Sequence, residues 1–137
     1  MAARLLIVAS AAIIFALGAL HLRYTFSGPK LRPRDPELED RLKTALPVIT
    51  RQTTMWKAWV GFNASHGLGA LFFGAVYGYL ALAESALLFR STYLAVIGGL
   101  LLGAYVVLAK RYWFSAPFRG VALAAACYAA GFIASLV

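Results

Sequence analysis

Long apolar runs, separated by charged residues, divide the chain into four segments. Between Lys, Arg, Asp and Glu residues, uncharged stretches cover residues 5–22, 58–83, 91–109 and 120–137. A helix needs about 20 mostly apolar residues to cross a hydrocarbon core about 30 Å thick, and these runs lack the alternation of membrane β-strands. With a few flanking residues each, they predict membrane-spanning helices. We expect these helices over about 5–24, 56–83, 91–111 and 118–137.

The connection over residues 23–57 has a helical pattern of its own. Asp35 is a suitable N-cap, and Pro36 suits the first helical position. The apolar residues that follow share one helical face: Leu38, Leu42, Ala45, Leu46 and Ile49. We expect a helix over about 36–49, ended or kinked by Pro47. An amphipathic helix of this kind lies in the headgroup plane; the alternative is a lid over a site between the spans.

Composition agrees with a membrane protein. Hydrophobic residues make up 62% of the 137 and charged residues 13%, against about 45–50% and 25% in soluble domains. One cysteine excludes a disulfide scaffold, and Cys127 is expected to be an inert, buried thiol. The predicted fold class is all-α, an integral membrane four-helix bundle with an amphipathic interfacial helix. We expect residues 1–137 to form a single transmembrane domain.

Basic residues are distributed very unevenly. Eight lie in the connection 23–57, three in the connection 110–119, and only Arg4 and Arg90 on the opposite side. The eight are Arg23, Lys30, Arg32, Arg34, Arg41, Lys43, Arg51 and Lys57. The positive-inside rule therefore puts both basic connections in the cytoplasm and both termini outside it. Arg4 ahead of an apolar run fits a signal peptide, but the charges just after the run favour a retained helix.

Net charge indicates the kind of partner. The formal charge of +8 suits anionic headgroups, which attract basic residues near the surface by about 1 kcal/mol each. No nucleic-acid-binding motif is present, so we expect membrane lipids and no nucleic acid. Small residues recur every four positions in the last three spans and let helices approach closely. They predict a tight bundle and a homo-oligomer or a larger membrane complex.

The start of the second span carries the candidate site. Trp56, Trp59, Asn63 and His66 are spaced at i, i+3, i+7 and i+10, which gives one helical stripe. If the hydrocarbon core begins near Ala58, His66 lies about 12 Å deep, close to the midplane. An ionisable residue at that depth is a functional candidate. Three roles are open for His66. It forms hydrogen bonds to neighbouring helices, it binds a ligand or acts catalytically, or it holds a metal or haem.

The other histidine is expected to be separate. His21 lies near the cytoplasmic end of the first span, where a hydrogen bond at headgroup level is the ordinary role. By residue count, His21 lies several ångströms shallower in the membrane than His66. Ligation of one haem iron by both imidazoles would therefore be strained. No Cys/His spacing typical of a metal site exists. We therefore expect no metal, and the sequence leaves the cofactor open.

Two resemblances follow from these residues. The segment Trp59-Val60-Gly61-Phe62-Asn63-Ala64-Ser65-His66 resembles the signature of an uncharacterised family of small bacterial four-helix membrane proteins. That resemblance implies the bacterial inner (plasma) membrane and no known activity. The architecture, with Asp35-Pro36-Glu37-Leu38-Glu39 before the second span, is similar to the microsomal glutathione transferase superfamily (MAPEG). Those proteins carry a Glu three residues after the Asn, where this chain has His66.

Three functions remain open from the sequence. First, Trp56, Trp59, Asn63, His66 and His21 bind an apolar or lipid-like ligand between helices. His66 is then the candidate catalytic residue, because an unperturbed pKa of about 6.5 allows acid and base roles. Second, the protein is a non-catalytic accessory or scaffold subunit of a membrane assembly. Third, it is a MAPEG-like glutathione-dependent membrane enzyme. A proton-coupled exporter is disfavoured, because all five acids lie in connections.

Overall fold

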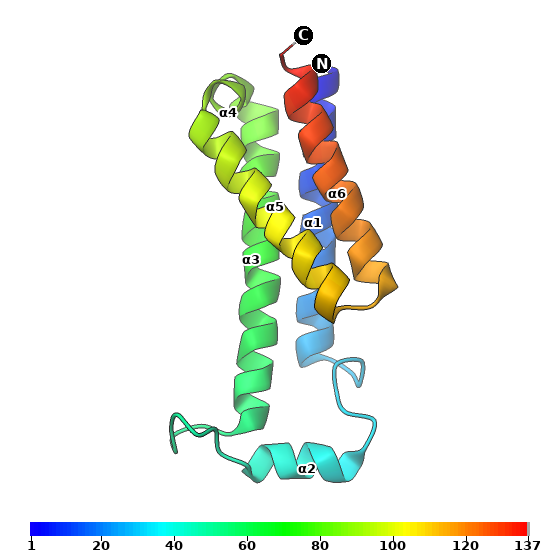
Figure 1. Ribbon diagram of the computed structural model, residues 1–137, viewed down its shortest axis with the longest axis vertical. Helices are drawn as coiled ribbons and strands as arrows, with labels where there is room; N and C mark the ends of the chain where they lie inside the picture. Colours follow the sequence, from blue (N-terminus) through cyan, green and yellow to red (C-terminus); the bar gives the residue numbers. More distant parts are fainter. Residues whose placement is uncertain (137) are drawn as a thin grey trace. The chain divides into compact units, whose positions relative to one another are not determined.

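The computed structural model describes residues 1–136, and its regular structure in that range is entirely α-helical. The helices are α1 (Ala2–Phe26), α2 (Pro36–Thr44), α3 (Met55–Ala83), α4 (Ser85–Arg90), α5 (Thr92–Tyr112) and α6 (Ser115–Ala134) (Figure 1). The predicted all-α class is confirmed. Four helices, α1, α3, α5 and α6, are long and apolar enough to cross a membrane. The last predicted span, 118–137, includes residue 137, which lies outside the described residues.

Two connections differ from the expected pattern. α2 begins as its sequence indicates, because the Asp35 carboxylate accepts a hydrogen bond from the Glu37 amide at 3.0 Å. It ends at Thr44 rather than near residue 49, because Ala45 has an extended backbone two residues before Pro47. Residues 84–90, unassigned in the sequence pattern, contain the short helix α4.

The described chain divides into two compact units. We call Met1–Leu17 with Ala70–Val137 the core unit, and Gly18–Gly69 the loop unit. The division falls within α1 and within α3, so each of these helices contributes to both units.

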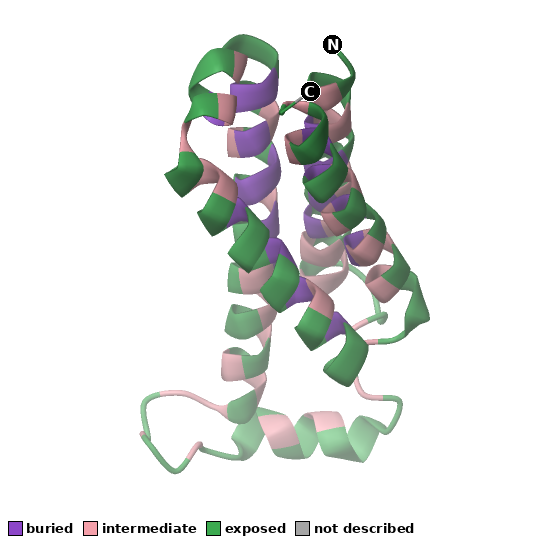
Figure 2. Ribbon diagram, turned by 45° about the horizontal axis from the view of Figure 1, so that its top comes forward, coloured by how far each residue is buried: buried purple, intermediate pink, exposed green. Residues whose placement is uncertain are grey.

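The core unit has a continuous apolar interior. Ile7, Ile14, Leu88 and Leu102 are its largest fully buried aliphatic side chains. Figure 2 shows the buried residues gathered along the inner sides of this unit's helices. Because lipid-facing side chains are apolar as well, exposure and not hydrophobicity distinguishes this interior from the outer surface.

Aromatic residues connect α3, α5 and α6 within this interior. Phe73 stacks on Tyr77 with ring centroids 4.5 Å apart, and Tyr77 meets Tyr128 edge-on at 5.6 Å. Both tyrosine hydroxyls donate to the Leu94 carbonyl, at 2.7 Å from Tyr77 and 3.1 Å from Tyr128. A buried hydroxyl without a partner is costly in an apolar surrounding. This shared carbonyl therefore joins three helices at one point.

Two further contacts hold α1 in the core unit. Arg4 donates from Nε to the Ala81 carbonyl at 3.0 Å and from Nη2 to the Leu82 carbonyl at 2.6 Å. These carbonyls lie at the C-terminus of α3, where a cation is favoured by the helix dipole. Gly74 allows α1 to approach α3 closely, since a Cβ there would lie 2.7 Å from the Ala11 carbonyl oxygen.

The small-residue repeats behave differently in the three spans. On α3 they lie on the packed side, with Ala70 and Gly74 buried. On α5 the glycine in close contact is Gly98, while Gly103 is exposed. On α6 the alanine repeat is partly or fully exposed, and Gly131 is the glycine that contacts α1. Of the three repeats, the one on α3 therefore packs within the chain, whereas those on α5 and α6 lie largely on the outer surface. Cys127, expected to be buried, is only partly so.

We predict that Gly98→Ala destabilises the protein and that Gly103→Ala does not. A Cβ on Gly98 would overlap the Tyr128 hydroxyl and lie 2.6 Å from the Tyr77 hydroxyl, so the shared bonds to Leu94 must break or shift. Overpacking of this kind costs about 1–3 kcal/mol. Gly103, on the same helix, has nothing within 4 Å of such a Cβ. Thermal unfolding of both variants in detergent measures the difference, and equal midpoints would contradict the assignment.

Candidate functional site

The five residues singled out by sequence come together in the loop unit. His21 is on the last turns of α1, and Trp56, Trp59, Asn63 and His66 follow one stripe of α3. Gly67 lets the two helices approach, because a Cβ there would lie 2.7 Å from Leu22 Cγ and 3.3 Å from the Gly18 carbonyl oxygen. The two polar groups of most interest, one from each helix, consequently face each other.

A hydrogen bond joins α1 and α3 at this point. His21 Nε2 lies 3.0 Å from Asn63 Oδ1, and Asn63 Nδ2 donates to the Trp59 carbonyl at 2.8 Å. The second bond fixes which end of the amide is the donor, so Oδ1 can only accept from His21. His21 must then carry its proton on Nε2. In the neutral ring this leaves Nδ1 as a hydrogen-bond acceptor.

The two histidines are neighbours. The rings of His21 and His66 have centroids 5.0 Å apart and meet edge to face at 77°. The inference that they lie at different depths is therefore wrong. It counted each helix from its own charged boundary, whereas the contacts of Gly67 bring residues 18 and 22 of α1 opposite residue 67 of α3.

Trp59 and Trp56 line a small cavity beside this pair. Trp59 donates from its indole nitrogen to the Leu31 carbonyl at 3.1 Å, which holds the connection after α1 against α3. The cavity has a volume of about 30 Å³. Its lining is Tyr24, Thr25, Phe26, Gly28, Leu31, Arg32, Trp56, Trp59, Val60 and Asn63. A space of this size holds one or two water molecules and not an acyl chain.

The lining separates the predicted residues into two groups. Asn63, Trp56 and Trp59 border the cavity, whereas His21 and His66 lie outside its lining, and His21 is linked to it by its bond to Asn63. The sequence reasoning missed Tyr24 and Arg32. Tyr24 is three residues after His21 and so shares its helical face, which was a usable signal. Arg32 lies in an irregular segment, where no periodicity indicates direction.

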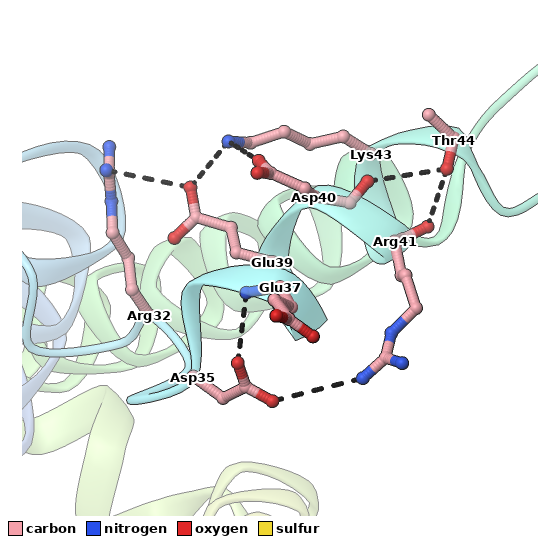
Figure 3. A network of polar contacts seen from close by, with 8 residues as sticks. All are labelled: Arg32, Asp35, Glu37, Glu39, Asp40, Arg41, Lys43 and Thr44. Carbon is pink, nitrogen blue, oxygen red and sulfur yellow. Dashed lines mark hydrogen bonds and ion pairs between the residues drawn. The ribbon is translucent and has the colours of Figure 1, made fainter.

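Arg32 also links the cavity to α2. Its guanidinium is 3.7 Å from the Glu39 carboxylate, which in turn contacts the Lys43 amine at 2.8 Å (Figure 3). Hydrogen bonds to Glu39 and then to Asp40 raise the pKa of Lys43, so it stays protonated through the physiological range. Arg41 pairs with Asp35 at 3.9 Å. Ion pairs near the surface contribute little stability individually, and of these pairs the one with Glu39 connects Arg32 to α2.

The chemistry available at the pair is that of imidazole and amide. Such groups donate and accept hydrogen bonds and exchange protons near neutral pH. Among residues 1–136, no group of three or more His, Cys, Asp or Glu side chains is arranged to hold a metal ion. The arrangement is therefore suited to recognising a polar group by hydrogen bonds.

No protein-family model, curated protein or solved structure matches this chain. The two resemblances drawn from the sequence therefore rest on its residues alone. For the MAPEG-like alternative, the decisive position is His66, because its imidazole is 5.0 Å from that of His21 where that superfamily has a carboxylate.

We predict that His21 is the Nε2–H tautomer and that Asn63→Ala abolishes this preference. The variant removes the acceptor for His21 and leaves the Trp59 carbonyl without its side-chain donor. Interhelical bonds of this type contribute about 0.6–2 kcal/mol. Nitrogen-15 spectra of the imidazoles report the tautomer, with Ser65→Ala as control, since Ser65 bonds only within its own helix to the Phe62 carbonyl. An Nδ1–H tautomer in the wild type would contradict the geometry.

Proposed function

We propose that this protein is a multi-pass protein of the bacterial inner membrane that binds a lipid-like amphiphile. The site would be the cytoplasmic end of α1 and α3, within the loop unit. One observation carries the proposal: a hydrogen-bonded His21–Asn63 pair, with His66 in ring contact, adjoins a tryptophan-lined cavity. The cavity combines indole walls with an amide that can bond a polar group of the ligand.

Charge placement supports the orientation of the chain. Within the core unit the two termini lie at the same end (Figure 1), as four spans require. Lys110, Arg111 and Arg119 lie near the turn between α5 and α6. With the basic connection 23–57, they favour a cytoplasmic location for this side and an external one for both termini. The four spans would form a bundle, with α2 in the headgroup layer.

Cavity size restricts which part of the ligand enters. A volume of about 30 Å³ accepts a hydroxyl or a single oxygen-bearing group and nothing larger. The polar groups bordering it include the Asn63 amide and the Arg32 guanidinium. Phe62 of α3, next to Asn63, is exposed and apolar, so the tail of the ligand can contact it. We therefore infer an amphiphile whose polar head meets the cavity while its tail stays in the bilayer.

A second candidate is a non-catalytic accessory or scaffold subunit, alone as a homo-oligomer or in a larger complex. The observation that favours it is the outward position of the small-residue repeats of α5 and α6. Gly99 and Gly103 are exposed on α5, as are Ala126, Ala130 and Ala134 on α6. Small residues on a lipid-facing side let another helix approach closely. The MAPEG-like enzyme is the least supported candidate.

We predict that His66→Ala lowers ligand occupancy about tenfold (about 1.4 kcal/mol), because its ring packs on His21, whose bond to Asn63 holds that amide at the cavity. Native mass spectrometry of protein extracted in mild detergent detects the bound molecule. Ser65→Ala is the matched control, because Ser65 is the adjacent residue and is exposed.

Thermal unfolding of ligand-stripped protein separates the two candidates. Binding predicts that restoring the ligand raises the unfolding midpoint of the stripped wild type more than that of stripped His66→Ala, whatever the lost ring contact with His21 itself costs. A ligand-free wild-type oligomer that His66→Ala destabilises would instead support the scaffold role.

A further inference from the structure

The connection between α2 and α3 is a closed loop rather than an extended linker. The Met55 amide donates to the Ala45 carbonyl at 2.8 Å, which joins the two ends of the segment 46–54. Within it, the Thr50 amide donates to the Pro47 carbonyl at 3.3 Å and the Gln52 amide to the Thr50 hydroxyl at 3.1 Å. Compact loops with joined ends are frequently functional.

The tip of this loop is aliphatic and unpacked. Val48 is fully exposed and Ile49 is 91% exposed, with Leu46 about half exposed beside them. Their side chains have no polar atoms, and exposing such surface to water is unfavourable. An ordered loop that presents contiguous apolar side chains marks an interaction surface. The remaining question is what covers it.

The charges around the tip indicate that a lipid surface covers it. Residues 45–57 include Arg51 and Lys57 and contain no acidic residue. On the neighbouring segment, Asp35 pairs with Arg41, and Glu39 and Asp40 share Lys43 (Figure 3). Residues 45–57 themselves carry a charge of +2, from Arg51 and Lys57, which suits anionic headgroups.

Chain connectivity keeps the tip near the bilayer. Ile49 is six residues from Met55, the first residue of the apolar helix α3, so it cannot lie more than about 20 Å from it. We propose that Val48 and Ile49 insert among the lipid acyl chains at the surface where α3 begins, with Arg51 at the anionic headgroups. This membrane contact requires no ligand at the histidine pair, so it goes beyond the proposed function.

Fluorescence quenching in the full-length protein tests the insertion. With Cys127→Ser as background, Ile49→Cys is labelled with bimane and reconstituted in vesicles of phosphatidylcholine and phosphatidylglycerol. Gln52→Cys is the control, because Gln52 is exposed in the same loop. We expect quenching by acyl-chain nitroxides to be several-fold stronger at residue 49 than at residue 52. Quenching by aqueous iodide should rank in the opposite order.

Two further measurements test whether the surface that covers the tip is an anionic bilayer. Adding Val48→Asp, or replacing phosphatidylglycerol with phosphatidylcholine, should reduce the nitroxide quenching at residue 49. Equal and weak nitroxide quenching at both positions would overturn the proposal. So would a disulfide-linked dimer of Ile49→Cys without lipid quenching, which would assign the tip to a second copy of the chain.

Discussion

Close approach of α1 and α3 is the constraint on which the rest of the structure depends. In a bilayer, lipid tails are as apolar as the side chains, so helices associate through fit and hydrogen bonds and not through hydrophobic burial. Glycine provides the fit in both units: Gly74 faces Ala11 in the core unit, and Gly67 faces Gly18 in the loop unit. The register they set brings His21 to Asn63.

The candidate site follows from that register. Once His21 meets Asn63, the amide has one orientation, the imidazole has one tautomer, and His66 lies against the same ring. Trp59 then extends the arrangement outward by bonding the Leu31 carbonyl, and Arg32 continues it to Glu39 on α2. Polar contacts thus lead from the histidine pair through the connection after α1 to Glu39 and Lys43 on α2. The polar group of the proposed ligand would meet these contacts at the cavity.

Hydropathy alone predicted the helical class and the four candidate spans, because a run of about 20 apolar residues is typical of a membrane-spanning helix. The start of α2 could also be predicted, because Asp35-Pro36 is a local signal that requires no tertiary contact. The stripe on α3 identified Trp56, Trp59, Asn63 and His66 for the same reason: periodicity within one helix is a property of the sequence.

The contacts between helices could not be predicted from the sequence. The proximity of His21 to His66 depends on how far one helix slides along the other, which a hydropathy profile does not contain. The repeats on α5 and α6 looked like packing surfaces, yet Gly98 and Gly131 make the close contacts, because a repeat does not say which side faces inward. Arg32 was missed since its position depends on an irregular loop.

The register claim is tested most directly by placing a methyl group between the two helices. Gly67→Ala puts a Cβ against Leu22 and Gly18, whereas Gly61→Ala, on the same helix, meets nothing within 4 Å. The measurement is the nitrogen-15 spectrum of His21. We predict that Gly67→Ala loses the Nε2–H preference and that Gly61→Ala keeps it. A wild-type spectrum in Gly67→Ala would show that the close approach does not set the site.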